Sequence, residues 1–146
     1  MKIAFGCDPN AQKLKETLIA HVKSLGHETA DLGAEDPIYA NTAFRVAKAV
    51  AAGEYDRGIL ICGTGIGVSI SANKVKGAYC ALVTDVYQAR RAQLSNDANL
   101  IALGAQVTGA ESAKCLVSEY LKNTYDPHSR SAVKIARICD YEEGKG

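Results

Sequence analysis

The feature that most constrains the fold is an alternation of short apolar segments with longer helical patterns along the whole chain. Five segments are apolar or β-branched and bounded by Gly, Asp or Asn, as buried parallel strands are; they cover Lys2–Gly6, Glu28–Gly33, Gly58–Cys62, Ala78–Val83 and Leu100–Gly104. Helical patterns cover Ala11–Leu25, Asn41–Ala52, Gly67–Lys74, Val86–Leu94, Ala110–Asn123 and Ala132–Tyr141. This order predicts an α/β fold, a doubly wound (Rossmann-like) αβα sandwich around a five-stranded parallel sheet.

Length and composition limit the domain organisation and the partners. A chain of 146 residues that is 47% hydrophobic can bury one core, so we expect a single domain over residues 1–146. The 17 basic and 16 acidic residues are scattered, which argues against a nucleic-acid partner. No apolar run approaches the roughly 20 residues of a membrane span, and we expect neither a targeting segment nor membrane contact. The five cysteines include no Cys-x-x-Cys pair, so we expect free thiols and a cytoplasmic protein.

Doubly wound sheets bind ligands beyond the carboxyl ends of their strands. Polar or glycine-rich residues mark four candidate positions: Gly6-Cys7-Asp8, the Cys62–Gly67 loop, Thr84-Asp85, and the Ser95-Asn96-Asp97 turn ahead of the fifth strand. The strand ends therefore predict where the functional site lies.

The loop after the third predicted strand has the strongest chemical signal. Gly63, Gly65 and Gly67 allow a strand-to-helix turn that exposes successive backbone N–H groups, and such a turn suits an anion. The closing Gly-Lys-Ser/Thr of a Walker loop and the spacing of a dinucleotide fingerprint are both missing. Gly-x-Gly-x-Gly alone is equally consistent with a simple tight turn.

Cys62 begins this loop and changes its interpretation. A thiol beside N–H groups and a helix N-terminus has its thiolate stabilised, so it can accept a proton near neutral pH. We interpret the other four cysteines (Cys7, Cys80, Cys115 and Cys139) as buried small apolar residues.

The segments Ile61-Cys62-Gly63-Thr64-Gly65-Ile66-Gly67 and Ser69-Ile70-Ser71-Ala72-Asn73-Lys74-Val75 resemble the signature of ribose-5-phosphate isomerase B and the related galactose-6-phosphate isomerase subunits. Further similarity lies in Gly6-Cys7-Asp8, Asp56–Leu60, Asn96–Asn99 and Gly104–Gly109. The resemblance implies an aldose–ketose isomerase that converts ribose 5-phosphate to ribulose 5-phosphate without a cofactor. It also implies a homodimer or tetramer with active sites at the subunit interface, which the C-terminal helix reaches.

The same resemblance implies roles for individual residues. Cys62 would be the base that moves a proton between C1 and C2 through a cis-enediolate. Thr64 and the loop around it (Gly63 and the N–H groups of Gly65, Ile66 and Gly67) would bind the substrate and hold the oxygen on which charge develops. Asp8 and Asn96 would bind sugar hydroxyls. Arg130 and Lys134 would reach the phosphate from the neighbouring subunit.

The chain also departs from the family pattern. Pro9 and Ser95 stand where the family usually has histidines, Gln106 stands where an arginine is common, and Tyr39-Ala40-Asn41 replaces a common Tyr-Pro-His. A serine cannot easily take the place of the imidazole that opens a cyclic sugar. A tetrose 4-phosphate cannot close such a ring, so the interconversion of D-erythrulose 4-phosphate and D-erythrose 4-phosphate is an alternative. The variant is similar to D-erythrulose-4-phosphate isomerases.

Other interpretations remain. His128 is a candidate to replace the missing ring-opening group, although an exposed loop histidine is the favoured interpretation. Arg90 and Arg91 are further candidates, and for them a solvated helix face and a phosphate role are equally favoured. A non-catalytic sugar-phosphate-binding subunit of a heteromeric isomerase is the main rival function. A flavodoxin-like relay is disfavoured because the strand ends carry no aromatic or acidic cluster. No histidine has metal-ligand spacing to Cys, Asp or Glu, so we expect no metal site.

Overall fold

The computed structural model describes residues 1–146 and confirms the predicted alternation of strands and helices. The strands are β1 (Lys2–Cys7), β2 (Glu28–Asp31), β3 (Arg57–Cys62), β4 (Cys80–Leu82) and β5 (Leu100–Gly104). A short 3-10 turn, η1 (Pro9–Ala11), precedes the first of the helices: α1 (Gln12–Ser24), α2 (Tyr39–Ala51), α3 (Ile66–Ala72), α4 (Val86–Asn96), α5 (Ala110–Lys122) and α6 (Ala132–Glu142). Every predicted boundary lies within two residues of the observed one.

All five strands are parallel and follow the order β2-β1-β3-β5-β4. The chain builds outward from β1 to β2 on one side and then returns to place β3 on the other side of β1. A reversal of this kind opens a crevice outside the carboxyl ends of the two strands that flank it. In this protein those strands are β1 and β3, which end in Cys7 and Cys62.

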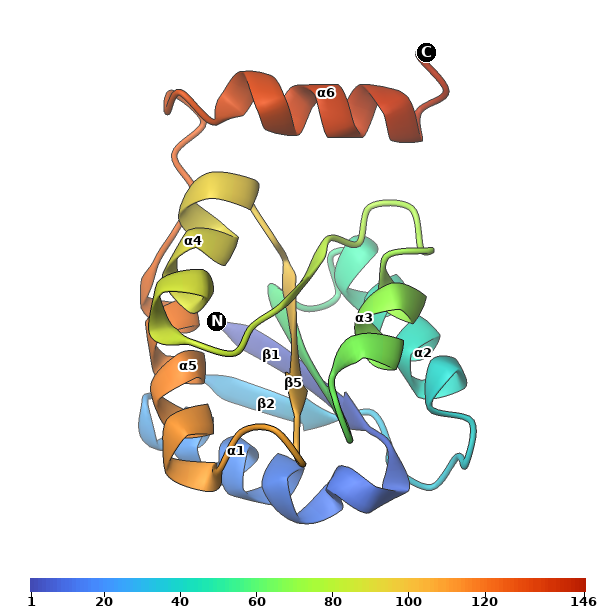
Figure 1. Cartoon of the computed structure of the whole chain (residues 1–146), viewed down its shortest axis with the longest axis vertical. Coiled ribbons are helices and arrows are strands. Elements are labelled where there is room, and N and C mark those ends of the chain that lie inside the picture. Colours follow the sequence, from blue (N-terminus) through green and yellow to red (C-terminus); the bar gives the residue numbers. More distant parts are fainter.

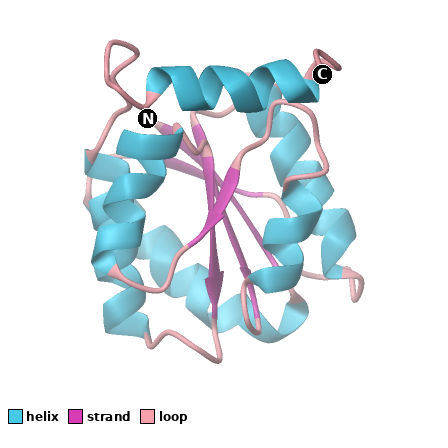
Figure 2. Ribbon diagram, turned by 45° about the horizontal axis from the view of Figure 1, so that its top comes forward, coloured by secondary structure: helices cyan, strands magenta, loops and turns pink.

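Alternating side chains of the strands form two cores, one on each face of the sheet. On one face, Ile3, Phe5, Ile59 and Ile61 pack with apolar residues of α1, α4 and α5. On the other face, Ala4, Leu60 and Cys62 pack with α2 and α3. Figure 2 shows the strands enclosed between these two layers of helices, which confirms the doubly wound αβα sandwich.

Two predicted strands extend further than the observed ones. β4 pairs only with β5, and its register covers Cys80 to Leu82. Beyond the register, single backbone hydrogen bonds continue on each side, from Leu100 N–H to the Tyr79 carbonyl and from Val83 N–H to the Ala102 carbonyl. β2 ends at Asp31, and two residues later Gly33 has a φ of 124°, which is incompatible with continued strand geometry. These differences arise at the two outer strands of the sheet.

Burial of the cysteines is correctly predicted for Cys7 and Cys80 and wrong for Cys115 and Cys139. Cys115 is exposed because it lies on the outward side of α5, between the buried Ala113 and Leu116. Cys139 is only partly buried because α6 has no buried residue at all.

Helix α6 packs differently from the others. It lies across the ends of the strands where they begin, which we call the amino edge, whereas the strands end at the opposite, carboxyl edge (Figures 1 and 2). Its last turn is fixed to the segment between α3 and β4, because Glu142 accepts hydrogen bonds from the Gly77 N–H (3.2 Å) and the Tyr79 hydroxyl (2.5 Å). None of the helices combines the length and apolar character that a membrane span requires.

Candidate active site

Cys62 is the last residue of β3, a central strand, and its side chain is 6% exposed. The backbone N–H of Gly65 points back at the thiol and donates a hydrogen bond to Sγ at 3.1 Å. This contact ties the loop to the thiol at the end of the strand. The thiol at the head of the loop therefore lies beside a backbone N–H donor.

Cys7 ends the neighbouring strand β1 and provides an internal comparison. It is fully buried, and this burial raises the pKa of its thiol to about 11, although the nearby Lys15 acts in the opposite direction. Cys7 is therefore a protonated core residue near neutral pH. The two adjacent strand ends carry the same residue type in different environments.

The glycines of the loop lie in close contact with neighbouring groups. Gly65 has a φ of 80°, and a Cβ there would lie 2.9 Å from the backbone carbonyl carbon of Leu103. Gly67 lies against the Tyr39 ring, so closely that a Cβ would overlap the ring atoms. Gly63 is covered by the Gln106 side chain, whose Oε1 would be 3.2 Å from an added Cβ.

Gly104 also packs against this loop, although it lies outside the loop motif and the motif alone does not predict its role. It ends β5, and a Cβ at this position would lie 2.6 Å from both the carbonyl carbon and the oxygen of Thr64. The chain beyond it also holds the loop, because Ala105 N–H donates to the Cys62 carbonyl at 2.8 Å and Gln106 N–H donates to the Gly63 carbonyl at 2.9 Å. The end of β5 thus packs against the Cys62 loop and holds it through two backbone hydrogen bonds.

A small cavity of about 260 Å³ opens at the carboxyl edge. We call it the carboxyl-edge pocket; it is lined by Asp8, Tyr39, Cys62, Gly63, Thr64 and Gly67. The structure therefore brings together four of the predicted loop residues and Asp8. Tyr39 was noted in the sequence only as part of a motif variant, and its place in the pocket depends on how α2 begins.

Two backbone N–H groups of the loop already have partners. Gly65 N–H bonds to Cys62 Sγ, and Ile66 N–H donates to Thr64 Oγ1 at 3.2 Å. Asp8 is fixed nearby, since its backbone N–H donates to the Ile61 carbonyl at 2.9 Å and its carboxylate accepts from Asn10 N–H at 3.1 Å. The loop is thus held in shape by its own polar groups.

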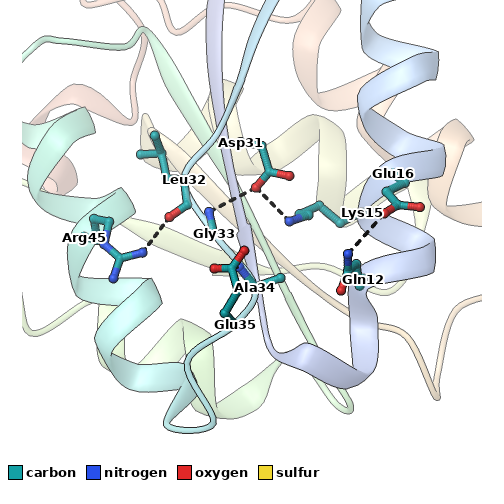
Figure 3. Close-up of polar contacts among 9 residues, drawn as sticks. All are labelled: Gln12, Lys15, Glu16, Asp31, Leu32, Gly33, Ala34, Glu35 and Arg45. Atoms are coloured by element: carbon teal, nitrogen blue, oxygen red, sulfur yellow. Dashed lines mark hydrogen bonds and ion pairs between the residues drawn. The ribbon is translucent and has the colours of Figure 1, made fainter.

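A polar network fixes the segment that leads from β2 to Tyr39 (Figure 3). The buried Lys15 ammonium pairs with Asp31 Oδ1 at 2.7 Å, and the same oxygen accepts from Gly33 N–H at 3.0 Å. Arg45 donates to the Leu32 carbonyl at 2.6 Å. Cys7 N–H donates in turn to the Gly33 carbonyl at 3.2 Å, which connects this segment to β1. The network therefore fixes the chain that follows β2 beside the end of β1.

The remaining predicted site residues lie at the other end of the sheet. A groove of about 660 Å³ between α4 and α6 contains Asn96, Arg130 and Lys134. We call it the amino-edge groove; its full lining is Tyr87, Arg91, Ser95, Asn96, Arg130, Ser131, Lys134, Ile135 and Ile138. Grouping Asn96 with the strand ends is therefore wrong, because Asn96 ends α4 and precedes β5, which places it at the amino edge.

The amino-edge groove has a positive charge that nothing in the chain neutralises. Arg91, Arg130 and Lys134 line it, no carboxylate does, and none of the three takes part in an ion pair. Arg90, the neighbour of Arg91, instead pairs with Glu119 at 2.6 Å. The groove has the electrostatic character of an anion site.

One chain does not bring the pocket and the groove together. Each lies at an opposite edge of the sheet, and a six-residue strand such as β3 spans about 17 to 20 Å. No side chain bridges that distance. Residues expected to act on one substrate are therefore divided between two surfaces of the chain.

Other candidates from the sequence lie outside both regions. His128 is exposed in the segment before α6 and does not line the groove. His21 bonds to Ser118 at 2.7 Å on the outside of α1 and α5. Three His, Cys, Asp or Glu side chains do not come together in a metal-binding arrangement at any place in the chain.

Comparison with known proteins extends the similarity to almost the whole chain. The Ribose/Galactose Isomerase family model matches residues 3–138. The chain is 42% identical to D-erythrulose-4-phosphate isomerase 2 of Mycolicibacterium smegmatis, over 97% of both chains. It is 44% identical to ribose-5-P isomerase B of Listeria innocua, over 92% of this chain and 93% of the relative. The solved ribose-5-phosphate isomerase B of Clostridium thermocellum superposes with a TM-score of 0.92 at 38% identity, with full coverage of both chains.

Proposed function

The chain belongs to the ribose/galactose isomerase family and is an enzyme of the ribose-5-phosphate isomerase B type, and on that premise we propose that it interconverts an aldose phosphate and a ketose phosphate at Cys62. The observation that carries this proposal is the Gly65 N–H aimed at Cys62 Sγ inside a pocket that also contains Asp8. A base and a hydroxyl-binding carboxylate in one cavity suit proton transfer on a sugar.

In the proposed reaction, the Cys62 thiolate removes the proton from C2 of the open-chain aldose. The electron pair forms the C1–C2 double bond of a cis-enediolate, and negative charge collects on O1. The Thr64 hydroxyl and the N–H groups of Gly65, Ile66 and Gly67 stabilise this charge, with the internal loop bonds giving way to the substrate oxygen. Cys62 then returns the proton to C1, and the O2 proton moves to O1 to leave the ketose.

We propose that two copies of the chain form each active site. Asp8 and Cys62 come from one copy, whereas Asn96, Arg130 and Lys134 come from the other and hold the distal hydroxyls and the phosphate. The separation of the two regions on opposite edges supports this arrangement. So do the exposed apolar residues of α6, since Val133 and Tyr141 are each 73% exposed. The assembly is a homodimer, or a tetramer of two such dimers, in which α6 reaches the partner.

The five free cysteines support a reducing compartment, which we propose is the cytoplasm.

Ribose 5-phosphate is the first candidate substrate, in line with the ribose-5-phosphate isomerases among the relatives. D-Erythrulose 4-phosphate is the second. It is favoured by the relative from M. smegmatis and by Ser95, which bonds to Arg91 and offers no imidazole to open a sugar ring.

Assays on the purified chain test this function. We expect turnover of at least one of the two sugar phosphates, and a loss of at least about 100-fold in kcat for Cys62→Ala, because a positioned base contributes that much or more. Cys115→Ala is the control, since this exposed thiol lies away from the pocket. Binding of both sugars without turnover would instead identify a non-catalytic subunit.

A further inference from the structure

Two adjacent arginines of α4 have different partners. Arg90 donates to Glu119 at 2.6 Å, and Glu119 also pairs with Lys122 at 2.7 Å. Arg91 has no carboxylate partner and points into the amino-edge groove with Arg130 and Lys134. Arg90 therefore braces α4 against α5, whereas the charge of Arg91 is available to a ligand.

The guanidinium of Arg91 is held in a defined position. Its Nε donates to Ser95 Oγ at 2.6 Å, one turn further along α4. The two terminal Nη groups have no partner within the chain, so they can bind an anion with two parallel N–H donors. Both Arg91 and Ser95 are half-buried, which strengthens charge interactions relative to a fully exposed site.

Arg91 also lies beside the residue proposed to bind sugar hydroxyls. Asn96 donates from Nδ2 to the Arg91 carbonyl at 3.4 Å, and both side chains line the same groove. The groove thus offers an anion two different surroundings. One is the α6 side, with Arg130 and Lys134, and the other is the α4 side, with Arg91 and Asn96.

We propose that Arg91 is a phosphate ligand that selects for a short sugar phosphate. The inference rests on the proposed function and adds to it the class of substrate. By drawing the phosphate toward α4, Arg91 shortens the span between the phosphate and the hydroxyls that Asn96 binds. A four-carbon sugar 4-phosphate fits this span better than a five-carbon sugar 5-phosphate. Ser95 serves as the positioning residue that aims the guanidinium.

Binding of inorganic phosphate, measured by calorimetry, tests the ligand role without any need for turnover. We expect Arg91→Met to weaken phosphate binding about 10-fold or more, since hydrogen bonds to charged groups contribute on that scale. Arg91→Lys should retain part of the affinity, and Arg90→Met should leave it unchanged. Equal phosphate affinity in Arg91→Met and the wild type would overturn the proposal, even if the chain is a working isomerase.

The ratio of kcat/KM for D-erythrose 4-phosphate to that for ribose 5-phosphate tests the selection. We expect Arg91→Met to lower this ratio about 10-fold. The phosphate of the four-carbon sugar loses its contact with Arg91, whereas the phosphate of the five-carbon sugar binds on the α6 side and keeps its contacts. Arg90→Met should leave the ratio unchanged. Equal losses for the two substrates would overturn the role in selection, and failure of the family activity would appear separately, as no turnover by the wild type.

Discussion

At the carboxyl edge of the sheet the functional groups are held by backbone atoms and glycines, whereas at the amino edge they are charged side chains on two helices. Gly65, Gly67 and Gly104 allow the Cys62 loop to pack against its neighbours at distances that no Cβ permits. In the amino-edge groove, the side chains of Arg130 and Lys134 have neither an ion pair nor a hydrogen bond within the chain. The pocket is therefore closely packed, and the groove is open and charged.

This difference supports the proposed sharing of each active site between two copies of the chain. Proton transfer requires a base fixed to within a fraction of an ångström, which a backbone-built loop provides. Phosphate binding requires charge and tolerates longer side chains. With the residue roles proposed above, one chain alone does not form a complete site, because the two regions lie at opposite edges.

The largest expected effect comes from mixing two impaired variants and assaying them at substrate concentrations well below KM, where the loss of a binding contact also lowers the rate. Cys62→Ala leaves the groove intact, and Arg130→Met leaves the pocket intact. If sites are shared between copies, dissociating and re-forming an equal mixture should restore about a quarter of wild-type activity, since half of the dimers then carry one complete site. Each variant re-formed alone is the control. Absence of any recovery in a verified mixed dimer would show that each site is built within one chain.

Substitutions in the groove should separate binding from chemistry. We expect Lys134→Met to raise KM about 10-fold or more with a smaller change in kcat, because it removes a charge contact to the non-reacting end of the substrate. Arg137→Met is the matched control on α6, since Arg137 lies outside the groove. A fall in kcat with no change in KM would place Lys134 in the chemical step instead.

Substitutions at the carboxyl edge should affect packing and the site together. Gly104→Ser places a Cβ 2.6 Å from the Thr64 carbonyl, so we expect a loss of about 1 to 3 kcal/mol in the free energy of unfolding and a reduced kcat. Gly109→Ser is the control, because nothing lies within 4 Å of its Cβ and Ser is a good helix N-cap. Denaturant unfolding measures the stability of both variants, and a turnover assay measures their kcat. Equal stabilities would mean that the loop shifts without cost.

The sequence predicts the carboxyl-edge pocket better than the amino-edge groove, for a physical reason. Cys62 and its glycines are adjacent in the chain, so their spacing records their geometry. Tyr39 and Gly104 enter the pocket through contacts between distant segments, which no local pattern records. The strand order has the same limit, since alternation predicts a parallel sheet without saying that β3 lies beside β1.

Asn96 shows where reasoning from strand ends fails. The rule that ligands bind at carboxyl ends applies to residues that follow a strand, and Asn96 precedes one. Arg90 and Arg91 show a second limit. The sequence leaves both as equal candidates for a phosphate role, and only the position of Glu119 on α5 distinguishes them.

The smallest expected effect concerns how α4 is held at the amino edge. Hydrogen bonds from Lys122 and Arg90 lower the pKa of Glu119 from 4.5 to about 2. The unfolded chain therefore binds more protons at this carboxylate than the folded chain does between those pH values. Its stabilising contribution is complete above about pH 4.5 and is lost as the pH falls toward about 2.

Thermal unfolding of Glu119→Gln measures this contribution. We expect the variant to melt below the wild type at neutral pH, and the gap to close as the pH falls toward about 2 because the wild-type carboxylate then becomes neutral as well. Glu111→Gln is the control, since its ion pair with Lys114 is highly exposed and contributes little. A gap that stays constant with pH would mean that Glu119 holds α4 by packing. The charges at the amino edge would then contribute to substrate binding and not to the stability of the fold.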